Sequence, residues 1–143
     1  MNQGVNAFGR SDYAFAVVHF EKAFELDPEL LTAQQYLATS YMMQYIPGGR
    51  SEENVAIASK ALEVFSDVLE KDPENTSALA YLASLYFNMG DKMDEAKESY
   101  NKLIALDPSD KQARYTMGVI AWTEAYQPRL DVRAAYYLSL IHI

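Results

Sequence analysis

The chain of 143 residues repeats the same helix ending three times. Each copy places an aromatic residue eight positions before the proline of an Asp-Pro pair, at Pro28, Pro73 and Pro108. These prolines are separated by 45 and then 35 residues. Self-similarity at a period of about 20–50 residues is typical of stacked supersecondary units that have no single closed core. The repeat therefore predicts an array of units whose working parts are surfaces.

The third copy shows how one unit is built. Apolar residues with helical spacing lie on both sides of the break at Asn88-Met-Gly-Asp91, which predicts two helices joined by a short turn. Pro108 ends the second helix because proline cannot continue the backbone hydrogen-bond ladder. Ser109 and Asp110 both offer oxygens that can cap the next helix. The two apolar stripes consist of Ala78, Leu79, Leu82, Ala83 and Tyr86, and of Ala96, Ser99, Tyr100, Leu103 and Ile104.

Small and aromatic residues recur in the same register elsewhere. Ala38 precedes Tyr41, Ala61 precedes Phe65, and Gly118 opens a fourth copy. On these residues the chain resembles the tetratricopeptide repeat family over roughly residues 1–125. The resemblance implies an all-α, right-handed α-solenoid of antiparallel helical hairpins with about three and a half repeats.

The register divides the chain into consecutive parts of one solenoid, residues 1–143. The parts are a partial first repeat (1–30), a second repeat (31–75) with an insertion near 46–56, a third repeat (76–110), and a partial fourth repeat (111–143) with a doubtful tail at 138–143.

The insertion makes the second repeat longer than the family's usual length of about 34 residues. Pro47-Gly48-Gly49 breaks the chain, and Ser51 is placed to cap a helix that we expect from about Glu52 to Lys71. Two interpretations stay open. The longer hairpin tip overhangs solvent, or the loop from Ile46 to Arg50 docks a partner.

Both ends of the sequence look cut. It begins inside the expected first helix of repeat one, so we expect a fragment of a longer protein, which we take to be a bacterial tetratricopeptide repeat protein. At the other end two interpretations stay open. Either residues 130–141 form a second helix that packs on Trp122, or residues 138–143 are translated adapter sequence from a fragmentary reading frame.

Composition narrows the function classes. The net charge is −8, and the 12 Lys and Arg residues form no basic cluster, so we expect no nucleic-acid binding. No run approaches the roughly 18 apolar residues of a spanning helix, so we expect no membrane insertion of this segment. The lack of cysteine excludes disulfides and thiol catalysis. It leaves the compartment open between the cytoplasm and a bacterial envelope.

The resemblance implies that the first helix of each repeat lines a concave groove. Phe8, Met42, Phe87 and Trp122 occupy equivalent places there and predict an apolar ladder along the groove, although such a stripe also fits a buried core. By the same register, the residues expected to contact a partner are Gln35, Thr39, Met42, Ser84, Phe87, Asn88, Tyr115 and Trp122.

Some family members bind C-terminal carboxylates through a clamp of lysine, asparagine and arginine. The groove positions here carry neither lysine nor arginine, and the nearest base is Arg114. We therefore expect a segment with apolar anchors as the ligand in place of an acidic tail.

Enzyme signals are weak in this chain. The segment from Gly4 to Ser11 has the spacing of a phosphate-binding loop, but it lies in an expected helical hairpin and follows no strand. His19 has no second histidine nearby, and the Glu52-Glu53 pair opens a helix, where the helix dipole favours negative charge. We expect no catalytic residues, no cofactor and no metal site, and conclude that the chain is not an enzyme.

The function predicted from the sequence is a protein-interaction scaffold that binds a peptide or a partner helix in the concave groove. The alternative is a structural spacer of a longer repeat array in a bacterial cell-envelope or multidomain protein, with end-to-end stacking on further repeats. The fold alone does not specify the partner.

Overall fold

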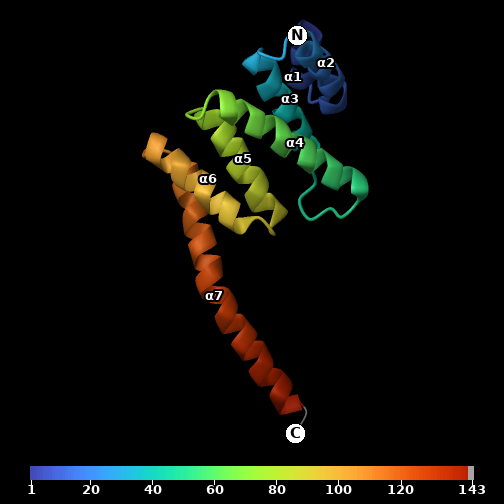
Figure 1. Cartoon of the computed structure of the whole chain (residues 1–143). Coiled ribbons are helices and arrows are strands. Elements are labelled where there is room, and N and C mark those ends of the chain that lie inside the picture. Colours follow the sequence, from blue (N-terminus) through green and yellow to red (C-terminus); the bar gives the residue numbers. More distant parts are fainter. Residues whose placement is uncertain (142–143) are drawn as a thin grey trace.

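A computed structural model describes the backbone of residues 1–141 and the side chains of residues 1–126. The regular structure in this part is entirely α-helical (Figure 1), which confirms the predicted all-α class. The helices are α1 (Asn2–Gly9), α2 (Tyr13–Leu26), α3 (Leu31–Gln44), α4 (Glu52–Lys71), α5 (Thr76–Met89), α6 (Met93–Leu106) and α7 (Lys111–Ile141).

The first six helices form three hairpins that stack in chain order. Within each hairpin α1 packs on α2, α3 on α4, and α5 on α6. Successive hairpins meet where α2 contacts α3, α4 contacts α5, and α6 contacts α7. Figure 1 shows the hairpins stacked one after another in chain order. This is the predicted solenoid of antiparallel helical hairpins.

The Asp-Pro pairs end the second helix of each hairpin. α2, α4 and α6 stop at Leu26, Lys71 and Leu106, directly before the aspartate of each pair. Those aspartates have ψ angles between 83° and 89°, far from helical values. A residue before proline is forced away from the helical region by the proline ring, so the repeated dipeptide sets where these helices end.

Side-chain caps set where helices begin. Ser51 accepts a hydrogen bond from the backbone N–H of Asn54 at 3.2 Å, and α4 runs from Glu52 to Lys71 as expected from the sequence. Asp110 accepts from the N–H of Ala113 at 2.9 Å at the start of α7. Each cap satisfies a backbone donor that has no partner inside the helix.

Small residues let the helices approach closely. Ala83 of α5 and Ala96 of α6 are fully buried where their helices meet, as the sequence predicted. A Cβ added to Gly4 of α1 would lie 2.9 Å from a ring carbon of Phe20 in α2. No side chain fits there without displacing the ring, so the first hairpin depends on glycine at this position.

α7 follows the third hairpin, where the sequence predicts a partial fourth repeat. Its first part packs on α6, and Lys97 of α6 forms an ion pair with Glu124 of α7 at 2.7 Å. The helix then runs on to Ile141 and extends away from the hairpins (Figure 1). Residues 130–141 therefore continue the helix that carries Trp122 and do not fold back as a separate helix over it. The side chains of the doubtful tail at 138–143 lie outside the described residues.

Candidate functional site

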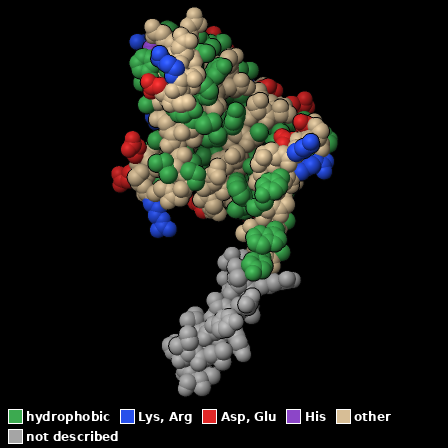
Figure 2. Space-filling view, turned by 180° about the vertical axis from the view of Figure 1, so that it is seen from behind, with side chains coloured by type: hydrophobic (Ala, Val, Ile, Leu, Met, Phe, Trp, Pro, Cys, Tyr) green, Lys and Arg blue, Asp and Glu red, His purple; other side chains and the backbone are tan. Residues whose placement is uncertain are grey.

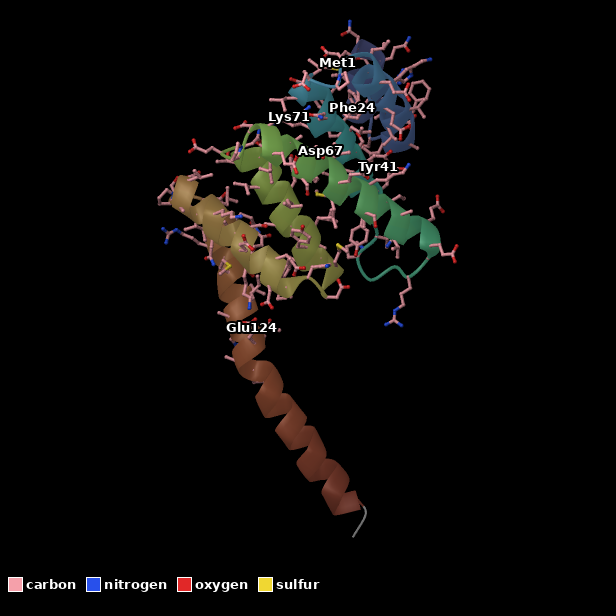
Figure 3. The ribbon with its side chains drawn as sticks, in the orientation of Figure 1. Met1, Phe24, Tyr41, Asp67, Lys71 and Glu124 are labelled. Atoms are coloured by element: carbon pink, nitrogen blue, oxygen red, sulfur yellow. The ribbon has the colours of Figure 1, made fainter. Side chains whose placement is uncertain are left out.

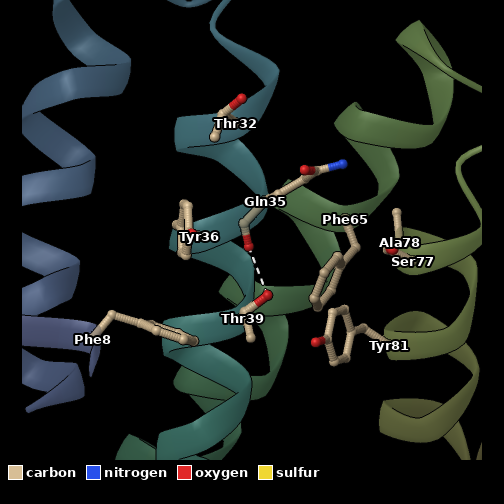
Figure 4. Close-up of a pocket in the computed structure, with 9 residues that line it drawn as sticks. All are labelled: Phe8, Thr32, Gln35, Tyr36, Thr39, Phe65, Ser77, Ala78 and Tyr81. Atoms are coloured by element: carbon tan, nitrogen blue, oxygen red, sulfur yellow. Dashed lines mark hydrogen bonds between the residues drawn. The ribbon is translucent and has the colours of Figure 1, made fainter. Parts of the chain in front are cut away.

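A cavity of about 290 Å³ lies between the first helices of the three hairpins. Figure 4 shows α3 at its centre, with α1 on one side and α5 on the other. The side chains around it are apolar, aromatic or uncharged and polar. They are Phe8 from α1, Thr32, Gln35, Tyr36 and Thr39 from α3, Phe65 from α4, and Ser77, Ala78 and Tyr81 from α5.

Two tyrosines of this cavity are held by aromatic stacking. Tyr36 lies parallel to the buried ring of Phe20, with ring centroids 5.2 Å apart and an interplanar angle of 10°. Phe8 meets Tyr36 edge-on at 5.3 Å. Tyr81 stacks on the buried ring of Phe65 at 5.8 Å and 25°. Because each tyrosine rests on a phenylalanine of the preceding hairpin, the cavity is formed before any ligand arrives.

Gln35 and Thr39, two of the predicted contact residues, lie at this cavity. Thr39 is buried and donates its hydroxyl hydrogen to the backbone carbonyl of Gln35 at 2.7 Å, the dashed line in Figure 4. That bond orients Thr39 and leaves its oxygen free to accept. The Gln35 side chain is half-buried, and its amide can both donate and accept hydrogen bonds at the cavity.

Other predicted contact residues lie further along the same face and are partly packed into the core. Met42 and Phe87 are half-buried against the two hydrophobic clusters. Ser84 is half-buried beside Tyr100. Burial raises the pKa of the Tyr100 phenol, and hydrogen bonds with Thr116 and Ser84 oppose part of that rise. These residues are therefore only partly available to a ligand.

Asn88, Tyr115 and Trp122 are the exposed members of the predicted set. The Asn88 carbonyl accepts a hydrogen bond from the hydroxyl of Tyr45 at 3.5 Å, which ties the end of α5 to the preceding repeat. Tyr115 is 69% exposed and Trp122 is 65% exposed, and the Trp122 ring stacks on Tyr126 at 5.1 Å. These aromatic groups lie on α7, away from the cavity.

The four residues of the expected apolar ladder thus differ in their surroundings. Phe8, Met42 and Phe87 are half-buried, whereas Trp122 is mainly exposed. In the space-filling view from behind, apolar side chains form an interrupted band that continues onto α7 (Figure 2). The expected ladder is therefore partly buried core and partly exposed surface. The two interpretations from the sequence, a buried core and a ligand surface, each fit some of its members.

Thr32, Tyr36, Ser77 and Tyr81 also line the cavity, although they are not among the residues predicted from the sequence to contact a partner. A signal for them was present, because Thr32 and Ser77, like Tyr36 and Tyr81, are 45 residues apart, the same period as Pro28 and Pro73. Residues with the same register in successive repeats occupy the same place along the solenoid.

The insertion forms an ordered loop held by one buried side chain. Asn54 accepts a hydrogen bond from the N–H of Ile46 at 2.8 Å and donates to the carbonyls of Ile46 and Gly49, both at 2.9 Å. Gly48 takes a positive φ of 75°, which glycine adopts without strain. The loop borders a cavity of about 530 Å³ next to Met89. A docking role for it stays a prediction.

The described residues show neither a membrane-spanning helix nor a metal-binding cluster. Among them, no helix has the length and apolar character needed to cross a membrane. Within the same part of the chain, no group of three or more His, Cys, Asp or Glu side chains is arranged to hold a metal ion. His19 contacts the ring of Phe15 edge-on at 4.5 Å on the surface of α2.

Comparison with known proteins identifies the repeat. Residues 58–120 match the family model described as tetratricopeptide repeat. The first tetratricopeptide repeat domain of Spaghetti (RPAP3), bound to the HSP90 peptide SRMEEVD, aligns with a TM-score of 0.70 at 18% identity, over 87% of this chain and 91% of that one. The predicted resemblance to the tetratricopeptide repeat family is confirmed, and the fold is that of its domains.

Curated relatives are matched over short segments. The chain is 37% identical over 60 residues to the probable UDP-N-acetylglucosamine–peptide N-acetylglucosaminyltransferase SPINDLY of Petunia hybrida, covering 42% of this chain and 6% of that protein. It is 29% identical over 111 residues to the STIP1 homolog of Dictyostelium discoideum, covering 78% of this chain and 18% of that protein. The chain thus spans a small part of each relative.

Proposed function

We propose that this chain is a protein-interaction module that binds a peptide or a partner helix along the face formed by α1, α3 and α5. The observation that carries the proposal is the cavity between these helices, whose lining contains no charged side chain. Tyr36 and Tyr81 are already fixed by stacking, so a ligand gains aromatic contact area at little cost in side-chain ordering. Preformed aromatic groups of this kind often dominate binding energy.

The proposed site extends from this cavity toward α7. Gln35 and Thr39 supply hydrogen bonds to the backbone of an extended ligand, and Ser84 and Asn88 continue the polar part further along. The half-buried Met42 and Phe87 border the ligand, while Tyr115 and Trp122 give exposed anchors at the α7 end. A ligand that reaches both ends would use apolar anchors at separate points, which favours an extended segment or one face of a helix.

The peptide complex of the Spaghetti domain supports peptide binding by this fold, but the ligand chemistry differs. The peptide SRMEEVD carries adjacent glutamates and ends in aspartate. Acidic groups bind well where lysine or arginine can pair with them. The cavity lining here has neither, and Arg114 donates its Nε hydrogen to the carbonyl of Pro108 at 2.7 Å. We therefore propose an uncharged ligand segment with apolar anchors.

The test is selection of a random peptide display library on the immobilised chain. Enriched peptides are then measured against Tyr81→Ala and against the double variant Phe87→Ala, Trp122→Ala. Phe15→Ala is the matched control, because Phe15 is an exposed aromatic residue of α2, outside the cavity lining. We expect both groove variants to weaken binding and the control to leave it unchanged. A folded Tyr81→Ala protein with unchanged affinity for every enriched peptide would refute the proposal.

A second candidate function is a spacer that stacks end to end with further repeats. The observation that favours it is the exposure of Tyr115, Trp122 and Tyr126 on α7. Sedimentation of the chain over a range of concentrations tests it: self-association that Trp122→Ala abolishes supports stacking, and a monomer at all concentrations contradicts it. The bacterial and cell-envelope setting stays a prediction from the sequence.

The proposal assigns binding to this chain and no catalytic step. The match to a probable glycosyltransferase covers 42% of this chain and 6% of that protein. That the chain is not an enzyme, and that it does not bind nucleic acid, remain predictions from the sequence.

A further inference from the structure

A second groove lies on the side of the solenoid formed by the second helices of the hairpins. It has a volume of about 430 Å³ and runs between α2 and α4, with α3 beneath it. Figure 3 labels Phe24, Tyr41 and Asp67, which come from these three helices. The groove has an apolar floor and a charged rim. Its lining consists of Glu21, Phe24, Glu25, Leu37, Tyr41, Lys60, Glu63, Val64 and Asp67.

The rim is strongly unbalanced in charge. It carries four carboxylates and one ammonium group. Lys60 lies 3.8 Å from Glu21, its ion-pair partner. Among the described residues, no basic side chain pairs with Glu25, Glu63 or Asp67. These three carboxylates on either side of one groove give it a negative potential that a cationic ligand would relieve.

Lys60 shows how a cation is held in this groove. Its Nζ lies 5.3 Å from the centre of the Tyr41 ring and donates a hydrogen bond to the Tyr41 hydroxyl at 3.4 Å. The Tyr41 hydroxyl in turn donates to the carboxylate of Glu21. An aromatic face with a carboxylate beside it is a favourable surrounding for an ammonium or guanidinium group. One part of the groove is thus occupied by the chain's own lysine.

The floor adds an apolar component to the groove. Leu37 is buried at its base, and Phe24 and Val64 are half-buried at its sides. From Lys60 to Asp67 the groove follows two turns of α4, about 10 Å at 1.5 Å per residue. That length accommodates about three residues of an extended chain. A ligand segment with an apolar side chain between two basic ones would match the apolar floor and the acidic rim of this groove.

We propose that this groove is a docking site for a basic segment of a partner protein. Lysine or arginine side chains of the segment meet Glu25, Glu63 and Asp67, and an adjacent apolar side chain packs on Phe24 and Val64. Charge complementarity decides the occupant. A second copy of this chain is disfavoured because its net charge is −8. The site is separate from the cavity between α1, α3 and α5, so it stands or falls independently of the function proposed for that cavity.

The test uses a fluorescein-labelled acetyl-Lys-Leu-Lys-Leu-Lys-amide peptide and fluorescence anisotropy at low ionic strength. Its counterpart with glutamate in place of lysine serves as the negative probe. The double variant Glu63→Gln, Asp67→Asn removes two charges from the rim. The matched control, Asp91→Asn with Glu98→Gln, removes two charges outside the groove, so its net charge equals that of the rim variant. We expect the rim variant to weaken binding about fivefold and the control less than about twofold.

A second pair of variants tests the groove in the opposite direction. Lys60→Gln removes the resident cation from beside Glu21 and the Tyr41 ring, so we expect tighter binding of the lysine peptide. Lys102→Gln is its control, an exposed lysine of α6 that pairs with Glu98. The proposal is overturned if the rim variant and its control weaken binding equally, because net charge alone then explains it. It is also overturned if the lysine peptide does not bind, or if Lys60→Gln binds it no better than Lys102→Gln.

Discussion

Replacing Asn54 with alanine tests how the insertion between α3 and α4 is held in place. Asn54 is 5% exposed although it lies in the first turn of a helix at the surface. Its side chain bonds to the N–H and carbonyl of Ile46 and to the carbonyl of Gly49, at 2.8, 2.9 and 2.9 Å. Asn54→Ala removes all three bonds at once. The N–H of Ile46 and the carbonyl of Gly49 lose their partner, whereas the carbonyl of Ile46 still accepts from the N–H of Gly49 at 3.0 Å.

The expected cost follows from these contacts. A hydrogen bond contributes about 1 kcal/mol net, so three sum to about 3 kcal/mol. Water can reach part of the loop, since Ile46 is 66% exposed, and rehydration of the freed groups lowers the cost to about 2 kcal/mol. Ser51→Ala is the matched control in the same loop. It removes a single capping bond to the N–H of Asn54, for which about 1 kcal/mol is typical.

The assay is urea unfolding followed by circular dichroism, with the free energy of unfolding compared between the two variants. Asn54→Asp sharpens the result, because aspartate keeps the acceptor for the N–H of Ile46 but turns a carboxylate toward two carbonyls. We expect it to be at least as unstable as Asn54→Ala. If Asn54→Ala loses no more stability than Ser51→Ala, the side chain does not hold the loop, and the reasoning is refuted.

Gly4, Tyr41 and the uncharged cavity each lead to a further prediction. Gly4→Ala should lower stability by about 1–3 kcal/mol in thermal unfolding, because its Cβ meets the Phe20 ring. Gly118→Ala, with open space around the added Cβ, should be neutral or slightly stabilising. Equal effects of the two substitutions would contradict the close packing at Gly4. Burial, and then the hydrogen bond to Glu21, raise the pKa of the Tyr41 phenol. Above about pH 10 the unfolded state therefore releases a proton that the native state keeps, so the free energy of unfolding should fall as pH rises. Tyr41→Phe should lessen that fall in alkaline unfolding curves. The peptide SRMEEVD should show no saturable binding in calorimetry, and a one-to-one isotherm would argue against the uncharged groove.

Features decided by a few neighbouring residues could be predicted from the sequence. Ser51 and the Asp72-Pro73 pair gave both ends of α4, from Glu52 to Lys71, without error. A cap or a proline acts on the backbone within one turn, so its effect does not depend on the rest of the molecule. The same reasoning gave Ser109 and Asp110 as candidate caps of the next helix, and Asp110 is the one that caps it.

Features that depend on stacking between hairpins could not be predicted in the same way. The register selected Met42 and Phe87 as groove residues, but both are partly covered by neighbouring helices, and the cavity lies at Tyr36 and Tyr81 instead. Which of several adjacent helix positions is exposed depends on the angle at which the next hairpin packs. The role of Asn54 was missed because it requires a loop that turns back over eight residues.

The two aromatic stacks also explain why the cavity lies among the first three hairpins. Phe20 stacks with Tyr36, and Phe65 with Tyr81, at the first two junctions between hairpins. At the third junction the equivalent residues are Tyr100 and Thr116, 35 residues further along. There both side chains are buried. A short threonine hydrogen-bonded to a buried phenol extends no ring into the groove. Small changes at one register position therefore determine where along a uniform solenoid such a cavity forms, and repeats of one fold can in this way come to differ in function.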